Sequence, residues 1–338
     1  MTVWMMTAML LSGCEQAPES ARSLIARTPA SVMYEQARNA IEEEGISHIV
    51  WGTTPFVSGP VPIAEQFQPT IDLVSQRLGV PMSVRAGEDY EHVETMLLAG
   101  EIDIAIMSPY AYVQAKSKDP EIRVFGSPIS NVTETYGAYI LTKEDAGVDD
   151  LSDLRNKPFA FVSSRSTSGW LYPASRLLDE GIDPTKDVKG AFYGNHGRVI
   201  AAIASGEVVA GATYDSALIQ GRGEIDGARE LRVIARTRRI PRDAYVVRSG
   251  FPVEALLGLS KALSSVSNRT VEGRAALAPL IDINGFVRAD DSMYKPVREI
   301  EDKVQSLLGA GGGLLPVVVP SEDGGVDETG DSEPTAVE

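Results

Sequence analysis

The chain has 338 residues, enough for two lobes or domains plus tails at about 150 residues per domain, and 43% of its residues are hydrophobic. Its net charge of −16 argues against non-specific binding to nucleic acid. Its single cysteine, Cys14, excludes an intrachain disulfide.

The first fourteen residues are typical of an export signal. Residues 3–11 form an apolar run, far shorter than the roughly 20 residues that span a bilayer, which fits a signal peptide. The sequence Leu-Ser-Gly-Cys at 11–14 resembles a bacterial lipoprotein box, although no Lys or Arg precedes Arg22. The alternative is a cysteine that merely follows an apolar leader. We expect residues 1–14 to be a lipoprotein signal peptide, with Cys14 lipidated and the protein exported to the periplasm or cell surface.

The next part of the chain predicts a first α/β unit. Residues 15–46 are expected to form a polar tether and a helix, which Ser31 caps and Gly45 ends. The folded body then alternates strands and helices, which predicts a parallel sheet with helices on both faces. Strand patterns lie at 48–52, 80–84, 102–107 and 123–126, and helical patterns at 62–78, at 89–98 and from Ser108 onward.

A second α/β unit is expected at about 142–240, after a strand at 136–142. Its strand patterns lie at 159–162, 191–194, 208–213 and 231–235. The chain returns to the first unit with a strand at 243–248, and two crossings predict a hinge with a ligand cleft between the lobes. Helices at 253–267, 270–279 and 293–308 complete the body. From Gly309 the composition is that of a disordered, acidic tail.

The most informative stretch is a hydroxyl-rich turn in the second unit. A buried strand at 159–162 is followed by Ser166, Thr167, Ser168 and Gly169, and then by a helical pattern. One hydroxyl would suffice to cap the helix. The extra hydroxyls, the free N–H groups and the helix dipole together predict an anion cradle, with an ordinary capped helix as the alternative.

Four motifs in this order resemble the phosphate, phosphite and phosphonate solute-binding proteins of ABC importers. In chain order they are Asp-Tyr at 89–90, the hydroxyl turn itself, Gly-Asn-His at 194–196 and Ile-Pro-Arg-Asp at 240–243. The resemblance implies a two-lobed periplasmic-binding-protein type II fold. Lobe 1 would comprise residues 47–140 and 243–308, lobe 2 residues 141–242, and the tail residues 309–338.

The resemblance also implies which residues contact the ligand. They are Tyr90, Ser166, Thr167, Ser168, His196 and Asp243. The hydroxyls and His196 would donate hydrogen bonds to phosphoryl oxygens, and Asp243 would accept one from a P–OH group. Tyr112 is a further candidate, with core packing as its alternative, and Arg165 would add a cation or face the solvent.

Without the resemblance, three of these residues would be assigned structural roles that involve no ligand. His196 would be a solvated loop histidine, Asp243 an acid at a strand edge, and Tyr90 an aromatic packed at a helix start. The three histidines, His48, His92 and His196, lack metal-ligand spacing, so neither a metal nor a cofactor is expected. A hydrolase triad of a serine with His196 and Asp243 lacks a nucleophile elbow, so we expect no enzyme.

The expected function is therefore that of the substrate-binding component of an ABC importer. It would be a monomer that binds a small phosphorus oxyanion (phosphonate, phosphite or phosphate). Its partners would be the permease and ATPase subunits and, through its lipid anchor, a membrane, but not nucleic acid. The alternative is a receptor of the same fold that signals to a membrane kinase or another partner.

Overall fold

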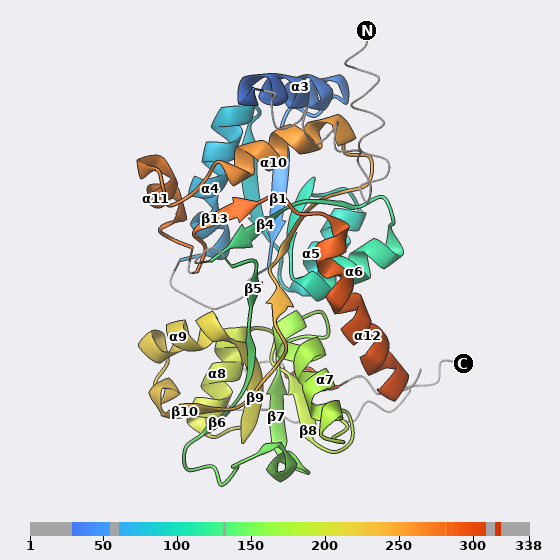
Figure 1. The fold of residues 1–338 in the computed structure, drawn as a ribbon. Helices are drawn as coiled ribbons and strands as arrows, with labels where there is room; N and C mark the ends of the chain where they lie inside the picture. Colours follow the sequence, from blue (N-terminus) through green and yellow to red (C-terminus); the bar gives the residue numbers. More distant parts are fainter. Residues whose placement is uncertain (1–28, 55–60, 131–132, 281, 309–314, 319–338) are drawn as a thin grey trace, which may run out of the picture.

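The computed structural model describes residues 29–54, 61–130, 133–280, 282–308 and 315–318. They form two α/β lobes that lie end to end (Figure 1). The expected signal peptide with Cys14 lies outside the described residues, as do residues 319–338 of the expected tail.

Lobe 1 contains a six-stranded sheet in the order β13-β4-β12-β3-β1-β2. Its strands β1, β2 and β3 are parallel, as the strand–helix alternation predicts. The complete sheet is mixed, because the returning strand β12, whose direction was not predicted, enters from the hinge and runs antiparallel to β3 and β4. The strands are β1 (Ile49–Thr53), β2 (Met82–Ala86), β3 (Ile104–Met107), β4 (Arg123–Ile129), β12 (Ala244–Val247) and β13 (Gly285–Val287).

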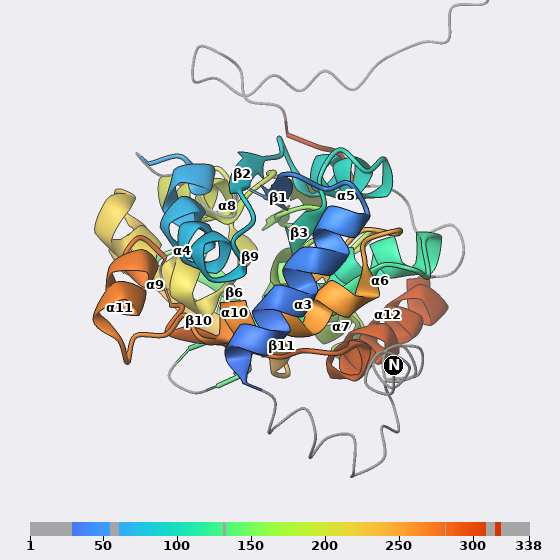
Figure 2. The same ribbon diagram turned by 90° about the horizontal axis from the view of Figure 1, so that it is seen from above.

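Helices cover both faces of this sheet, as expected. One core joins the sheet to α3, α4, α10 and α11, and the other joins it to α5 and α6. Figure 2 shows α3 and α10 side by side above the sheet. The helices are α3 (Ala30–Glu43), α4 (Ile63–Leu78), α5 (Tyr90–Leu98), α6 (Pro109–Lys118), α10 (Leu256–Ser264) and α11 (Val271–Leu277).

The helix ends of lobe 1 show which sequence signals correctly predicted where a helix begins or ends. Asp89 caps α5 by accepting from the His92 N–H at 2.8 Å, and Gly79 ends α4 in the left-handed conformation, both as the sequence predicts. The predicted cap at Ser31 is wrong. Because α3 begins at Ala30, Pro29 occupies the cap position and Ser31 lies inside the first turn.

Lobe 2 contains a five-stranded sheet in the order β10-β6-β9-β7-β8. Strand β7 is parallel to its neighbours β8 and β9, whereas β6 is antiparallel to β9 and β10. The strands are β6 (Ala138–Lys143), β7 (Pro158–Phe161), β8 (Lys189–Phe192), β9 (Ala210–Tyr214) and β10 (Leu231–Arg236). The helices are α7 (Tyr172–Asp179), α8 (His196–Ser205) and α9 (Asp215–Glu224).

Two short antiparallel strands form the hinge between the lobes. They are β5 (Thr135–Tyr136) and β11 (Ile240–Pro241). The strand predicted at 136–142 is thus two strands, β5 and β6, which are interrupted at Gly137. The Gly137 N–H donates to the Asp215 side chain at 3.0 Å instead of continuing a ladder.

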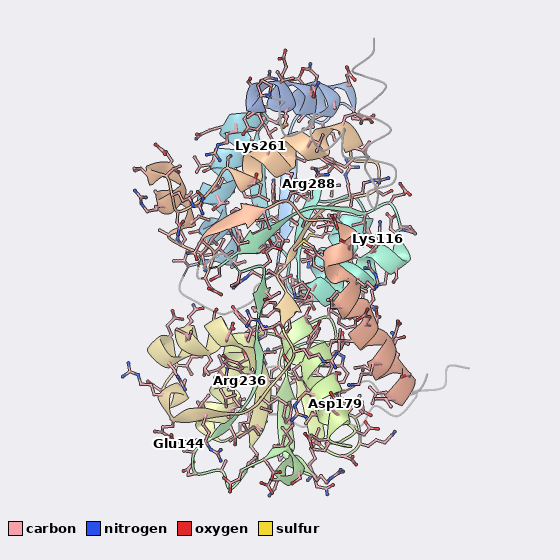
Figure 3. All side chains as sticks on the ribbon, in the orientation of Figure 1. Lys116, Glu144, Asp179, Arg236, Lys261 and Arg288 are labelled. Carbon is pink, nitrogen blue, oxygen red and sulfur yellow. The ribbon has the colours of Figure 1, made fainter. Side chains whose placement is uncertain are left out.

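The chain also crosses between the lobes a third time, which the sequence did not predict. Helix α12 (Lys295–Leu308) was expected wholly in lobe 1, but it packs against α6 of lobe 1 and α7 of lobe 2. Lys303 of α12 pairs with Asp179 of α7, which Figure 3 labels beside the lower part of α12. A cross-lobe contact of this kind depends on tertiary packing and has no local signal.

The expectation of a disordered tail from residue 309 is wrong for residues 315–318. The Phe192 N–H donates to the Pro316 carbonyl, and the Val318 N–H donates to the Phe192 carbonyl, both at 2.8 Å. Leu315 is buried in the core of lobe 2 with Phe161 and Phe192. Strand β8 lies at the edge of its sheet, where unpaired backbone groups favour such pairing.

Candidate ligand-binding site

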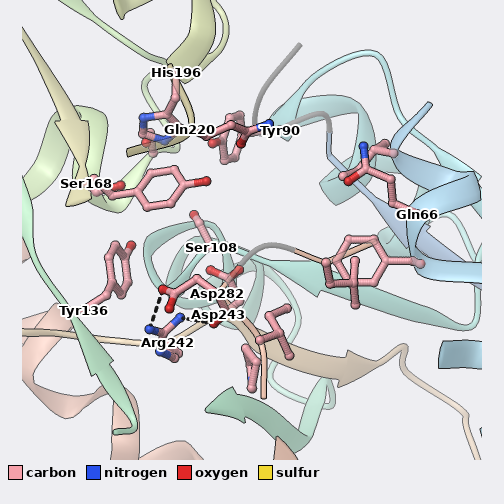
Figure 4. A pocket seen from close by; sticks show the side chains of 17 residues that line it. Gln66, Tyr90, Ser108, Tyr136, Ser168, His196, Gln220, Arg242, Asp243 and Asp282 are labelled. Atoms are coloured by element: carbon pink, nitrogen blue, oxygen red, sulfur yellow. Dashed lines mark hydrogen bonds and ion pairs between the residues drawn. The ribbon is translucent and has the colours of Figure 1, made fainter. Parts of the chain in front are cut away.

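A cavity of about 130 Å³ lies between the lobes, and Figure 4 shows the side chains that line it. Lobe 1 contributes Ile63, Gln66, Phe67, Tyr90, Ser108, Pro128, Leu280, Asp282 and Ile283. Lobe 2 contributes Ser166, Ser168, His196, Tyr214 and Gln220. The hinge region contributes Tyr136, Arg242 and Asp243. The cavity therefore lies where the two predicted crossings place a cleft.

The hydroxyl turn brings two serines into the wall of the cavity. Ser166 caps a π-helical turn, Thr167–Leu171, by accepting from the Gly169 N–H at 3.0 Å. The Val162 N–H donates to the Gly169 carbonyl at 3.1 Å, which folds the turn back onto the end of β7. A Cβ at Gly169 would lie 2.3 Å from a Val162 methyl carbon, so this close return requires glycine.

Several helix N-termini converge on the cavity. Tyr90 and His196 are the first residues of α5 and α8, whereas Ser108 and Ser166 cap α6 and the π-helical turn. The N–H groups of a first helical turn lack intrahelical acceptors and carry partial positive charge. Their convergence favours an anion in the cavity in spite of the net charge of −16.

Two tyrosine–serine pairs supply neutral donors. The Tyr90 side chain of lobe 1 interacts with Ser166 of lobe 2, and that of Tyr136 interacts with Ser168. Burial raises the pKa of both tyrosines well above the ordinary value, so they stay neutral. Each of these hydroxyls carries a proton that it can donate to an incoming acceptor.

His196 is a buried, neutral group in this wall. Its Nδ1 lies 2.9 Å from the Thr213 hydroxyl, and its ring meets the Tyr214 ring edge-on with 4.7 Å between centroids. Burial lowers the pKa of His196 to about 3, so the imidazole carries no charge at neutral pH. The tautomer in which Thr213 donates to Nδ1 leaves an N–H donor on Nε2.

Asp243 is one of two acidic residues that line the cavity. Desolvation raises its pKa to about 7, against the opposing effect of the neighbouring Arg242 cation. The guanidinium of Arg242 is already engaged, because its Nη2 donates to Asp282 at 2.8 Å (dashed in Figure 4). Asp243 can therefore exchange a proton with a ligand near neutral pH.

Asp282 lies beside Arg242 in the wall of the cavity. It accepts hydrogen bonds from Ser130, from Ser216 of lobe 2 at 2.6 Å and from Arg242. Burial opposes its ionisation, but these hydrogen bonds and the Arg242 charge hold the pKa of Asp282 below its ordinary value. Its carboxylate thus stays charged and its oxygens are occupied by protein donors.

The structure brings five of the residues that were predicted to contact the ligand to one cavity. Tyr90, Ser166, Ser168, His196 and Asp243 all line it. Thr167 lies behind the wall, where its Oγ1 accepts from the Tyr110 N–H at 2.8 Å and its side chain is fully buried. Thr167 therefore fastens the hydroxyl turn to α6 and does not face the cavity.

Tyr112 also lies away from the cavity, and its side chain packs in the core, which was the alternative interpretation. Its hydroxyl donates to Asp291 at 2.6 Å, and its ring lies 4.8 Å from that of Tyr294 between centroids. The helical rotation of α6 decides this, because α6 directs Tyr112 into the core that it shares with α12.

Arg165 has a role that neither sequence interpretation anticipated. Its Nε donates to Glu94 of α5 at 3.0 Å, and the Glu94 side chain is only 3% exposed. Lys118 contacts the other oxygen of Glu94 at 2.6 Å. The Ser108 hydroxyl also donates to the Arg165 carbonyl at 2.9 Å. Together these contacts join the hydroxyl turn to lobe 1 across the cleft.

Sequence reasoning missed several residues of the wall. Tyr136 and Tyr214 lie at the ends of predicted strands, and Arg242 lies inside a quoted motif, so these positions could have been found. Asp282 and the apolar residues of lobe 1 carry no sequence signal. In the part of the chain that the structure describes, no helix is long and apolar enough to cross a membrane, and no acidic, His and Cys cluster could hold a metal.

The family model of periplasmic substrate-binding proteins of phosphonate ABC transporters matches residues 52–294. The phosphate-import protein PhnD of Mycolicibacterium smegmatis is 29% identical over 160 residues, which cover 44% of this chain and 50% of that protein. The tetrathionate sensor histidine kinase TtrS of Salmonella typhimurium is 24% identical over 167 residues, 48% of this chain and 28% of that protein. The chain thus spans half or less of these curated relatives.

Two solved structures share the fold. A binding protein component of an ABC phosphonate transporter from Pseudomonas aeruginosa has a TM-score of 0.69 at 21% identity, over 77% of this chain and 87% of the other. PhnD1 from Prochlorococcus marinus, solved with methylphosphonate, has a TM-score of 0.68 at 19% identity, over 77% of this chain and 98% of the other. These likenesses show the two-lobed architecture of periplasmic binding proteins.

Proposed function

The chain belongs to the family of periplasmic substrate-binding proteins of phosphonate ABC transporters, and on that premise we propose that it binds a small phosphorus oxyanion between its lobes and delivers it to an ABC permease. The observation that carries this proposal is the convergence of helix N-termini and neutral donors on one cavity. The proposed role is binding and release without turnover of the ligand.

The proposed binding mode uses fixed donors in place of water. The hydroxyls of Tyr90, Tyr136, Ser166 and Ser168, which all line the cavity, would donate to phosphoryl oxygens. Nε2 of His196 donates a further hydrogen bond, and the N–H groups of the hydroxyl turn supply partial positive charge. Because these donors are neutral, the anion gains directional hydrogen bonds and no full countercharge from them.

Asp243 would select the protonation state of the ligand. An ionised carboxylate repels a fully ionised anion, but it accepts a hydrogen bond from P–OH, which phosphate and phosphonate monoanions carry and sulfate lacks at neutral pH. Since the pKa of Asp243 is about 7, the protonated acid can donate to sulfate at lower pH. Discrimination against sulfate should therefore weaken as the pH falls below about 7.

The substitution Asp243→Asn tests this selection. The amide keeps the shape of the side chain and can donate to an unprotonated oxygen. We expect phosphate to bind more weakly and sulfate to bind measurably at pH 8, as measured by calorimetry. If the variant bound phosphate no more weakly and still excluded sulfate, the selection mechanism would be wrong.

Ligand binding itself can be tested by thermal unfolding of the chain from residue 15 to residue 338. Phosphate, phosphite, methylphosphonate, arsenate and sulfate would each be added in turn. A ligand at 100 times its dissociation constant stabilises the protein by about 2.7 kcal/mol, which raises the midpoint by roughly a few degrees. No shift with any phosphorus ligand, in a protein that unfolds cooperatively, would contradict the proposal.

We further propose that the protein acts outside the cytoplasm as a monomer, with Cys14 lipidated and anchored in a membrane. The lipoprotein-like sequence before Cys14 supports the anchor. Labelling with a radioactive fatty acid tests it. We expect incorporation into the wild-type chain and none into Cys14→Ser, and unlabelled wild-type protein would contradict the anchor.

A receptor role is the second candidate, and the partial match to a sensor histidine kinase favours it. In that role the same closure would be detected by a signalling partner instead of a permease. Reconstituted permease whose ATP hydrolysis rises with the ligand-loaded protein would support import. Loaded protein that fails to stimulate the permease encoded nearest to it would favour the receptor.

A further inference from the structure

The cavity has two unlike walls, and the second contains five apolar side chains beside the amide of Gln66. Ile63 and Phe67 come from α4, Pro128 from β4, and Leu280 and Ile283 from the segment after α11. All five belong to lobe 1, and none of their side chains can donate to an oxyanion. The polar groups that Figure 4 labels on the lobe 2 side, Ser168 and His196, lie away from α4, which carries Gln66.

The size of the cavity exceeds the needs of an inorganic oxyanion. A buried water requires roughly 10–15 Å³ on the scale used for such cavities. The volume of about 130 Å³ therefore corresponds to roughly ten such sites. Phosphate has five non-hydrogen atoms, so a phosphate held by the polar wall would leave space beside the apolar wall.

The charges next to the apolar wall disfavour a cationic substituent. The only charged groups that line the described cavity are Arg242, Asp243 and Asp282. Asp282 already accepts from Ser130, Ser216 and Arg242, and Asp243 is assigned to the P–OH group. An ammonium group here would face the Arg242 guanidinium and would have no free carboxylate partner, which makes its desolvation costly.

We propose that the preferred ligand is an organophosphonate whose substituent on phosphorus is small, uncharged and apolar, and that Ile63, Phe67 and Ile283 contact that substituent. This inference rests on the proposed function, since it assumes that the polar wall holds the phosphoryl group. It assigns phosphate the role of a weaker ligand of the same site.

Calorimetric titration of the chain from residue 15 to residue 338 tests the inference with a graded series. The ligands are phosphate, methylphosphonate, ethylphosphonate, propylphosphonate and 2-aminoethylphosphonate. Each methylene that reaches the apolar wall contributes about 0.8 kcal/mol, so affinity should rise about fourfold per step until the wall is filled. The aminoethyl compound has the same number of non-hydrogen atoms as propylphosphonate and should bind at least tenfold more weakly.

Two variants separate the apolar wall from general damage to the fold. Ile63→Ser places a hydroxyl in the wall at a half-buried position, and we expect it to flatten the alkyl series, so that affinity no longer rises with alkyl length. Val61→Ser is the matched control. Val61 lies two residues away, is 46% exposed and does not line the cavity, so its series should match the wild type.

The outcomes distinguish this inference from the proposed function. If phosphate binds as tightly as the alkylphosphonates, the apolar subsite is wrong and the proposed function stands. If 2-aminoethylphosphonate binds more tightly than propylphosphonate, the substituent is not uncharged. If neither phosphate nor any phosphonate binds, the proposed function fails as well. A steep series that Ile63→Ser flattens and Val61→Ser preserves supports the inference.

Discussion

The two lobes contribute opposite chemistry to the same cavity. Lobe 2 presents Ser166, Ser168 and His196 at helix starts, whereas lobe 1 presents mostly aliphatic and aromatic carbon. The polar groups of lobe 1 are Gln66, Tyr90, Ser108 and Asp282, and the Ser108 hydroxyl donates to the Arg165 carbonyl of lobe 2. The difference indicates that recognition of the oxyanion and recognition of its substituent are separable. Closure of the lobes brings the two together.

The largest effect is expected at Asp243, which lies between the two walls. The pKa of Asp243 is about 7 in the folded protein, whereas an aspartate in the unfolded chain has the ordinary value of 3.8. Between these two pH values the folded protein retains a proton that the unfolded chain releases. Stability is therefore lost as the pH rises from about 4 to about 7, by up to about 4 kcal/mol at 1.4 kcal/mol per pKa unit. Asp243→Asn removes this loss.

Urea unfolding at pH 4 and pH 8 checks this prediction. The variant and the wild type should be similar at pH 4, and the variant should be the more stable at pH 8. His196 has the opposite effect on the pH dependence of stability. Folding lowers its pKa from 6.5 to about 3, so stability is lost as the pH falls from 6.5 to about 3. A variant that is less stable than the wild type at pH 8 would contradict the assignment of Asp243.

The next largest effect concerns the polar wall. Ser168→Ala removes one hydroxyl donor from the cavity wall, and a hydrogen bond to a charged group contributes about 1.5–3 kcal/mol. We expect a loss of about 10- to 100-fold in affinity, by the same factor for phosphate and for every alkylphosphonate. Calorimetry checks this, with the exposed Ser205→Ala of lobe 2 as the control. A loss of affinity confined to the alkylphosphonates would contradict the assignment of the phosphoryl group to the polar wall.

A smaller effect is expected from residues 315–318, which pack against lobe 2. Truncation after Leu308 exposes the surface that Leu315 buries and removes two backbone hydrogen bonds to Phe192. The released residues regain conformational entropy, which offsets part of this effect. We therefore expect the free energy of unfolding to fall by about 1–2 kcal/mol. Hydrogen exchange should accelerate in β8 but not in β1. Truncation after residue 320 keeps residues 315–318 and should leave both rates unchanged.

The smallest effect is expected at the ion pair that joins the lobes. Arg165→Ala leaves Glu94 with Lys118, so the buried carboxylate keeps one partner. We expect a loss of only about two- to fivefold in ligand affinity, because the closed state becomes less populated. A double-mutant cycle with Glu94→Gln measures the coupling. Additive effects of the two substitutions would show that the pair does not stabilise closure.

The elements of both lobes were largely predictable because their signals are local. Apolar periodicity located the helices and strands, and residues such as Asp89 and Gly79 marked helix ends through backbone geometry that depends on few neighbours. The main features that were not predicted are the antiparallel direction of β12 and the pairing of residues 315–318 with β8. Both depend on which strand edge is free in space.

The sequence by itself determined the two-lobed α/β fold and the polar wall. A short motif such as residues 166–169 carries its own backbone geometry, so the hydroxyl turn was recognisable without the structure. The tertiary structure alone decided which other residues join it. The apolar wall and Asp282 come from segments far from the motifs, Tyr112 is turned into the core, and Arg165 is paired across the cleft. The physical reason is that a cavity between lobes is formed by long-range packing, which no local pattern encodes.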